Sequence, residues 1–176
     1  MEPKVWMQNK RLVLKNKKLE LLKEQAFHEE QTLLNEMSPE EQFDYMISKM
    51  NYCRRKHALS CLEFNVLIDV GDICYIDYGN SYINETGYLH FGLILALNHG
   101  KAFVVPITGS NNRLMEKDVE HVYKLGKVKG MKKICMCYLN DAKWINTSRI
   151  IDVKSHLPVL SKSFKEIKEK VIENMM

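Results

Sequence analysis

The sequence predicts a mixed α+β protein in which two N-terminal helices precede a small twisted β-barrel that is closed by a C-terminal helix. Residues 4–36 contain neither Gly nor Pro and are dense in Lys, Glu, Gln and Leu, which is typical of a helix. From about Phe64 the chain changes to short runs of branched and aromatic residues separated by turn signals, which is typical of strands. Residues 161–174 return to helical spacing.

The first predicted helix carries a narrow apolar column. Its members recur every seven residues, which is the spacing of a coiled-coil seam: Val5, Leu12, Leu19, Ala26 and Leu33. The companion positions are mixed, since Leu22 is apolar but Lys15 and Glu29 are charged, so the apolar stripe is narrow. Two interpretations remain open: an arm for a partner or for dimerisation, and a helix that folds against its own domain.

The second predicted helix has a clear start. Ser38 is expected to be the N-cap, Pro39 the first helical residue, and Glu41 the residue that completes a capping box. The helix is expected to run to about Ala58. Its buried face is predicted from residues at three- and four-residue steps: Phe43, Met46, Ile47, Met50, Cys53 and His57.

The β-rich part is predicted to hold strands at 64–68, 72–78, 90–97, 102–107, 133–139 and 143–145. The polar connection 98–101 contains Gly100 and predicts a hairpin. Residues 109–130 hold few apolar side chains and are expected to form a long mobile loop. In the closing helix Phe164, Ile167, Val171 and Ile172 form one stripe. The predicted domains are a helical extension at 1–60 and a barrel domain at 64–176.

The composition narrows the class of protein. A formal net charge of +4 and a pI near 8.7 permit a nucleic-acid partner without requiring one. The five cysteines show neither zinc-ligand spacing nor a disulfide framework, and Cys135 and Cys137 are expected to be small core residues on one strand face. No membrane span and no signal-peptide hydrophobic region are recognisable, so we expect a reduced, cytoplasmic protein without a membrane partner.

Four separated segments resemble the MazF/PemK family of toxin ribonucleases in order and spacing, across roughly residues 69–175. They are Gly71 to Asp77, Glu85-Thr86-Gly87 followed by the strand His90 to Leu95, Val105-Pro106-Ile107-Thr108, and Leu139 to Ile150. The chain is also similar, more distantly, to the ToxN/AbiQ ribonucleases of the same fold. The resemblance implies a partly open SH3-like barrel with a C-terminal helix, and leaves the N-terminal helices unmatched.

The resemblance implies an endoribonuclease that cleaves single-stranded RNA, expected to be messenger RNA, with no metal and no cofactor. A ribose 2′-hydroxyl would attack the adjacent phosphate and leave 2′,3′-cyclic phosphate and 5′-hydroxyl ends. Thr108 falls on the catalytic threonine of the family, whereas His90 stands where the family has a catalytic arginine. His90 could act as acid or base, because histidine titrates near neutrality. Alternatively, loss of the arginine leaves a module that binds but cuts poorly.

Four further residues are candidates for the RNA-binding groove. Glu85 falls on an acidic loop residue of the family, Lys143 on an arginine, and Ser110 is expected on the same strand face as Thr108. Tyr88 offers a stacking platform for an unpaired base. The resemblance also implies a homodimer and a cognate antitoxin, in a toxin–antitoxin or phage-defence system. The alternative function is a degenerate binding module that acts through a protein partner, as CcdB does, or through RNA binding.

Overall fold

The structure is a computed structural model, and it describes residue 10 and residues 18–110 and 119–175. The chain divides into two compact units, Met1–Phe43 and Asp44–Met176. Most of α3 (Pro39–Arg55) therefore belongs to the same unit as the strands, whereas the sequence places the division near residues 60–64. Among the described residues, no helix combines the length and apolar character that crossing a membrane requires.

The first unit contains α2 (Leu19–Glu36) and the start of α3. None of the residues of α2 is buried, and Leu21 and Phe27 are 68% and 65% exposed. The predicted capping box is confirmed, because the Ser38 N–H donates to Glu41 Oε2 at 2.8 Å and the Glu41 N–H donates to Ser38 Oγ at 3.3 Å. These bonds lower the pKa of Glu41. Val5 and Leu12 of the predicted column lie outside the described residues.

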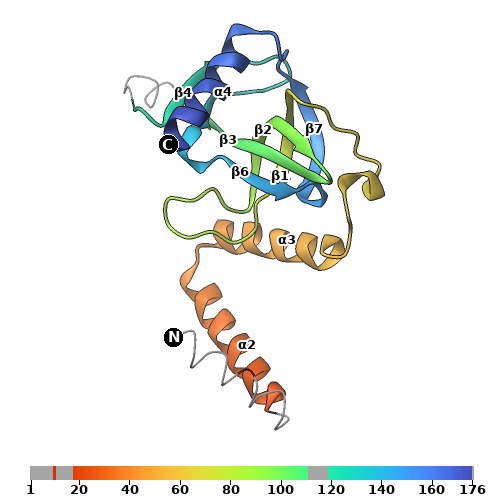
Figure 1. Cartoon of the computed structure of the whole chain (residues 1–176). Coiled ribbons are helices and arrows are strands. Elements are labelled where there is room, and N and C mark those ends of the chain that lie inside the picture. The colour runs from red at the N-terminus through yellow and green to blue at the C-terminus, as the bar shows by residue number, and fades with distance from the viewer. Residues whose placement is uncertain (1–9, 11–17, 111–118, 176) are drawn as a thin grey trace. The chain divides into compact units, whose positions relative to one another are not determined.

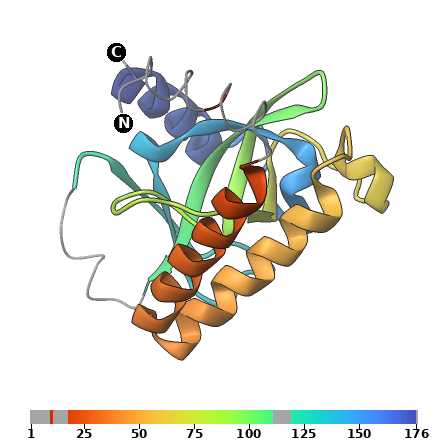
Figure 2. The same ribbon diagram turned by 90° about the horizontal axis from the view of Figure 1, so that it is seen from below.

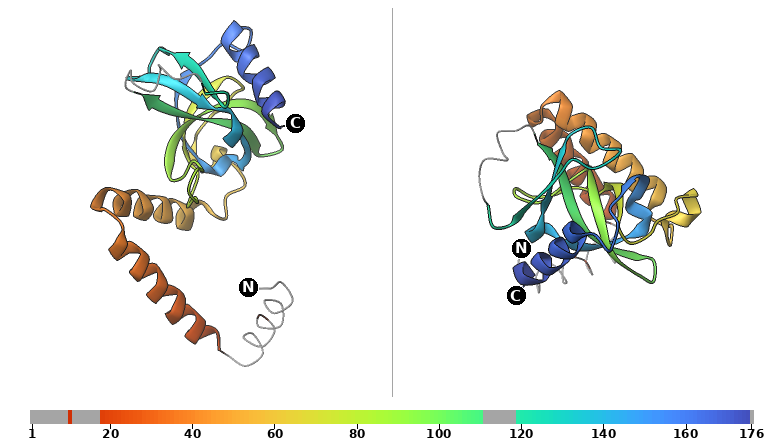
Figure 3. Two further views of the ribbon diagram at one scale, coloured as in Figure 1. Left: turned by 90° about the vertical axis from the view of Figure 1, so that its left-hand side faces the viewer. Right: turned by 90° about the horizontal axis from the view of Figure 1, so that it is seen from above.

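The second unit is an antiparallel sheet with helices packed against it (Figure 1). Within the described residues the sheet has seven strands in the order β4-β5-β3-β2-β1-β7, with β6 paired to β3. Their bounds are β1 Asp72–Asp77, β2 Leu89–Asn98, β3 Lys101–Ser110, β4 Val122–Gly126, β5 Ile134–Tyr138, β6 Lys143–Asn146 and β7 Ile150–His156. Register shifts interrupt three of the strand pairs, and such bulges bend a sheet, as Figure 3 shows.

The predicted hairpin is confirmed and joins β2 to β3. Asn98 pairs with Lys101, which leaves His99 and Gly100 as a two-residue turn. Their φ angles of 43° and 76° are both in the left-handed region, as a type I′ turn requires. Because this turn follows the twist of the strands, it fixes the register of the pair that later carries the candidate site.

Two predictions about the strands are wrong, and one strand was not predicted. Residues 61–64 form a 3₁₀ helix in which the Cys61 N–H bonds to Thr147 Oγ1, and residues 65–68 pair with none of the strands that the structure describes. Within 109–130 the chain forms β4, where Tyr123 and Leu125 supply enough apolar contact for an edge strand. The sequence analysis also missed β7, an amphipathic edge strand whose partner among the described strands is β1.

The core of this unit has two parts, one on each face of the sheet. The larger cluster lies beneath α4 (Lys162–Met175), where Phe164, Ile167 and Val171 are buried as predicted. Ile172, predicted for the same stripe, is 50% exposed. Cys135 and Cys137 are buried in this cluster, which confirms their expected role as small core residues. The second cluster, on the other face, includes Cys61, Ile76, Ile94 and Val104.

The part of α3 from Asp44 onward packs on the opposite side of the sheet from α4 (Figures 1 and 2). Its predicted buried face is wrong. Phe43, Met46 and Met50 are 65%, 45% and 41% exposed, whereas Tyr45 and Ser48 are buried. The helix is held by polar contacts instead, because Ser48 Oγ donates to Asp77 Oδ1 at 2.6 Å and Arg55 Nη1 donates to two backbone carbonyls.

Candidate functional site

A cleft of about 590 Å³ gathers residues from four segments of the chain. The cleft is lined by the loop before β2, by strands β2 and β3, by the residue before β4, and by the end of β5 with the short 3₁₀ turn that follows it. The lining residues are Asn84, Glu85, Thr86, Gly87, His90, Pro106, Ile107, Thr108, His121, Tyr138, Asn140 and Asp141. Three of the sequence-predicted residues, Glu85, His90 and Thr108, therefore share one cleft.

His90 and Thr108 face each other across neighbouring strands. Phe91 pairs with Ile107 in the β2–β3 ladder, so the next residues along, His90 and Thr108, lie opposite one another. Phe91 and Ile107 pack in the larger core cluster. Because side chains alternate along a strand, His90 and Thr108 project from the other face, away from that cluster. The strand register alone thus brings an imidazole and a hydroxyl together.

One hydrogen bond determines how His90 presents its ring. Nδ1 lies 2.6 Å from the carbonyl oxygen of Gly87. A carbonyl can only accept, so we assign the proton of the neutral imidazole to Nδ1. This assignment leaves Nε2 with its lone pair. His90 is exposed, so Nε2 can act as a base toward a molecule in the cleft.

The loop that carries Glu85 is tied to the far wall of the cleft. The Thr86 N–H donates to Asp141 Oδ2 at 2.7 Å, and the other carboxylate oxygen of Asp141 lies 2.6 Å from Lys143 Nζ. Glu85 itself is exposed, and its Oε2 accepts from the Tyr82 N–H at 3.3 Å. Asp141 therefore links the loop before β2 to the first residue of β6.

Two other predicted site residues, Lys143 and Tyr88, lie outside the lining of the cleft. Lys143 is connected to it through Asp141, and its ammonium also lies 5.7 Å from the centre of the Tyr78 ring. Tyr88 has a left-handed φ of 50°, and its ring packs edge-on against Tyr45 of α3 with centroids 6.3 Å apart. Ser110 ends β3, where its backbone pairs with Ile134, while its side chain lies outside the described residues.

Sequence reasoning did not name six of the polar lining residues as site candidates: Asn84, Thr86, His121, Tyr138, Asn140 and Asp141. His121 falls in the stretch expected to be a loop, and the backbone bond from Leu139 N–H to its carbonyl oxygen, 2.8 Å long, holds it beside the end of β5. The one available signal was the alternation of Val122, Tyr123, Lys124 and Leu125, which indicates a strand directly after His121.

A buried phenol lies close to Asp141 and Lys143. Burial, and then the charge of Asp141, raise the pKa of Tyr78 far above its usual value, so the phenol stays neutral. Gly92 makes room for it, because a Cβ on Gly92 would lie 2.3 Å from the Tyr78 oxygen. In the part of the chain that the structure describes, no group of three or more His, Cys, Asp or Glu side chains is arranged to hold a metal ion.

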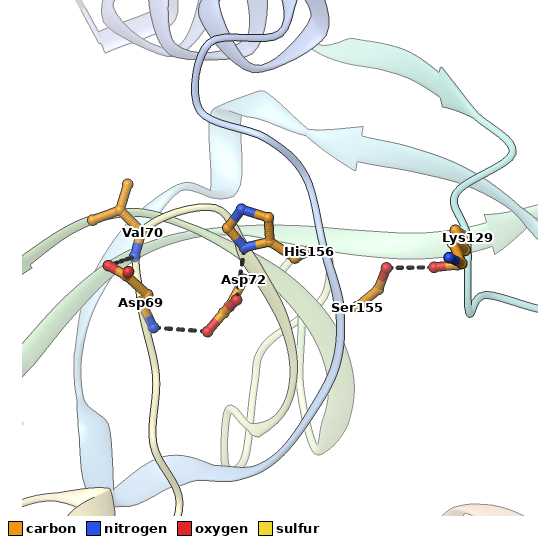
Figure 4. A network of polar contacts seen from close by, with 6 residues as sticks. All are labelled: Asp69, Val70, Asp72, Lys129, Ser155 and His156. Carbon is orange, nitrogen blue, oxygen red and sulfur yellow. Dashed lines mark hydrogen bonds and ion pairs between the residues drawn. The ribbon is translucent and has the colours of Figure 1, made fainter.

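A second cleft of about 510 Å³ lies beside α4 and contains none of the predicted site residues. His156, at the end of β7, bonds through Nδ1 to Asp72 Oδ1 at 2.8 Å, and Asp72 Oδ2 accepts from the Asp69 N–H at 2.7 Å (Figure 4). Ser155 next to it donates to the carbonyl of Lys129. These bonds join the start of β1 to the end of β7, so they serve the architecture of the sheet.

No protein-family model matches the sequence, and a comparison with curated proteins gives no match either. Solved structures do match. MazF from Deinococcus radiodurans has a TM-score of 0.50 and 15% identity over 62% of this chain and 96% of that chain. An endoribonuclease in complex with its cognate antitoxin from a mycobacterial species has a TM-score of 0.46 and 10% identity over 62% of this chain and 95% of that chain. The Mycobacterium tuberculosis toxin MazF-mt6 has a TM-score of 0.45 and 13% identity over 59% of this chain and 95% of that chain. The resemblance expected from the sequence is thus confirmed at the level of the fold.

Proposed function

We propose that this protein, which has the fold of MazF, is an endoribonuclease that cleaves single-stranded RNA. The observation that carries the proposal is the pair His90 and Thr108, which line one cleft from opposite positions on β2 and β3. In the proposed reaction a ribose 2′-hydroxyl attacks the adjacent phosphate and leaves a 2′,3′-cyclic phosphate and a 5′-hydroxyl. This chemistry requires no metal ion or cofactor.

Each member of the pair has a defined task in this reaction. Nε2 of His90 removes the proton of the 2′-hydroxyl, since Nδ1 is bound to the Gly87 carbonyl. The Thr108 hydroxyl donates to a phosphoryl oxygen as negative charge develops there. The family arginine is absent, so a neutral base takes the place of a fixed positive charge.

The remaining predicted residues are proposed to hold the RNA strand. Lys143 supplies positive charge beside the cleft, and its link to Asp141 keeps the ammonium in place. Glu85 and Ser110 are proposed to line the path of the strand, and Tyr88 to stack on an unpaired base. We also propose that the sheet and α4 form a partly open SH3-like barrel of the MazF/PemK type.

The proposed partners follow from the same resemblance. We propose a homodimer formed through the barrel, and an antitoxin that occupies the cleft and blocks RNA, in a toxin–antitoxin or phage-defence system of the cytoplasm. A binding module is the second candidate function. It is favoured by the apolar side chains that α3 leaves exposed, among them Met46 and Met50 at 45% and 41% exposure.

The test is incubation of the purified full-length protein with a long single-stranded RNA in EDTA, followed by mapping of the cut ends. We expect cyclic phosphate ends from the wild type. His90→Ala should lower the rate about 10²–10⁴-fold, as loss of a general base does, and Thr108→Ala about 10²–10³-fold. The control is His57→Ala, because His57 is exposed beyond the end of α3. Absence of cleavage by the wild type would support the binding module instead.

A further inference from the structure

We infer that His121 is the general acid of the cleft, which protonates the 5′-oxygen that leaves when the RNA chain is cut. The inference rests on the proposed ribonuclease function and adds a catalytic residue to it. Cleavage by 2′-hydroxyl attack needs a base for the nucleophile and an acid for the leaving group. His90, whose free ring nitrogen is Nε2, supplies only the first of these.

The other proton-carrying groups of the cleft are occupied or unsuited. Asp141 accepts the Thr86 N–H through one oxygen and is paired with the Lys143 ammonium through the other, so both of its oxygens are occupied. Glu85 likewise accepts a backbone N–H through its carboxylate. A threonine hydroxyl and the Tyr138 phenol are weak acids compared with an imidazolium. Of the lining residues that the structure describes, His121 is the one besides His90 whose side-chain type exchanges a proton near neutral pH.

The order of the strands places the two histidines on opposite sides of Thr108. Across the sheet the strands lie in the order β4-β5-β3-β2. His121 directly precedes β4, Thr108 lies on β3 and His90 lies on β2. Two contacts hold His121 in place: its carbonyl accepts from the Leu139 N–H at 2.8 Å, and the next residue, Val122, pairs with Tyr138 on β5. A displacement at phosphorus keeps the attacking and leaving oxygens roughly in line, with the base and the acid on opposite sides. The arrangement matches that requirement.

The proton balance is complete with these groups. The 2′-hydroxyl proton passes to His90 Nε2 as the bond from the 2′-oxygen to phosphorus forms. The bond from phosphorus to the 5′-oxygen breaks, and that oxygen takes a proton from the protonated His121 ring. The products are the cyclic phosphate and a free 5′-hydroxyl, and exchange with water returns both imidazoles to their starting states.

The test compares two RNA substrates that differ by one atom at the cut site. In the second substrate sulfur replaces the bridging 5′-oxygen, and a thiolate leaves without needing a proton. On the oxygen substrate, His121→Gln and His90→Gln should each lower the rate about 10²–10⁴-fold. On the sulfur substrate, His121→Gln should recover to within about tenfold of the wild type, while His90→Gln should stay slow. The control His57→Gln should match the wild type on both.

The possible outcomes separate the two proposals. If the wild type cleaves neither substrate, the ribonuclease function itself is wrong. If the wild type cleaves and His121→Gln is fully active on the oxygen substrate, the inference is overturned and the nuclease stands. An equal loss by His121→Gln on both substrates also overturns it, because a folding or binding defect acts on both alike. Recovery on sulfur alone supports the assignment of His121.

Discussion

Gly87, which lines the cleft, has little room for a side chain. A Cβ at this position would lie 2.0 Å from Ser81 Oγ and 2.8 Å from Ser81 Cβ, so Gly87→Ala must move one side of the loop. The Gly87 carbonyl would then leave His90 Nδ1. We expect Gly87→Ala to destabilise the fold by about 1–3 kcal/mol, as overpacking does, and to slow RNA cleavage at least tenfold. Urea unfolding and the RNA assay measure the two effects.

The matched second change is Ser81→Gly, which removes both atoms that the new methyl group would meet. The double variant should regain most of the activity lost by Gly87→Ala, whereas Ser81→Gly alone should remain close to the wild type. If Gly87→Ala alone cleaves RNA at the wild-type rate, the bond from the Gly87 carbonyl does not control the orientation of the His90 ring.

For single residues, the sequence predicted the site residues whose partners are close along the chain. His90 and Thr108 belong to one hairpin with a recognisable turn, so their positions could be compared with a known pattern. His121 enters the cleft through the pairing of β3, β4 and β5, and Asp141 is tied to it by the Thr86 N–H, 55 residues away along the chain. Their contribution depends on long-range packing, which the pattern of residue types does not fix.

Among the elements, α3 is tied to the end of the chain's strand region by Arg55. The Arg55 Nη1 group donates to the carbonyls of Ser148 and Ile150 at 3.2 and 3.1 Å, and the guanidinium lies 4.0 Å from the centre of the Phe64 ring. Arg55→Met should lower the free energy of unfolding by about 1.5–3 kcal/mol, the usual size for hydrogen bonds to a charged group. Urea denaturation gives the value directly.

Arg54 provides the control for this prediction, because it is the neighbouring arginine on the same turn of α3 and is exposed. Arg54→Met should change stability by no more than about 0.5 kcal/mol, as surface substitutions usually do. Equal effects of the two substitutions would mean that the charge of the helix end, and not the two carbonyl contacts, accounts for the contribution of Arg55.

The elements also show where sequence patterns mislead. The capping box of α3 was predicted correctly because its contacts span only three residues. The buried face of the same helix was predicted wrongly, because an apolar stripe through Met46 and Met50 and a second stripe through Tyr45 and Ser48 both have helical spacing. The choice between them is made by Asp77 on β1, which accepts the Ser48 hydroxyl.

For the whole molecule, buried acidic groups set the behaviour at high pH. Burial raises the pKa of Cys74 from its usual 9.0 to about 12, and it also raises those of Cys137 and Tyr78. The pKa values of these groups are higher in the folded state than in the unfolded state. The stability that the buried neutral groups contribute is therefore full below about pH 9 and is lost as the pH rises from 9 toward 12. The urea midpoint should therefore stay level from pH 7 to 8.5 and fall above that range.

Cysteine variants separate this effect from general alkaline damage. Cys74→Ala should show a shallower fall between pH 9 and 11 than the wild type, because it removes one buried group that the unfolded chain ionises. Cys53→Ala should follow the wild-type curve, since Cys53 is exposed. An unchanged slope in Cys74→Ala would show that other groups govern the alkaline limit.

The pairing of β1 with β7 also determines when the sheet can be completed during synthesis. β1 to β3 leave the ribosome first and form a local meander, but the second edge of β1 receives its partner only after His156 has been made. Until then the nascent chain carries an unpaired strand edge, which is a place where chains associate wrongly. The C-terminal third of the chain therefore acts late, in closing an edge that translation leaves open.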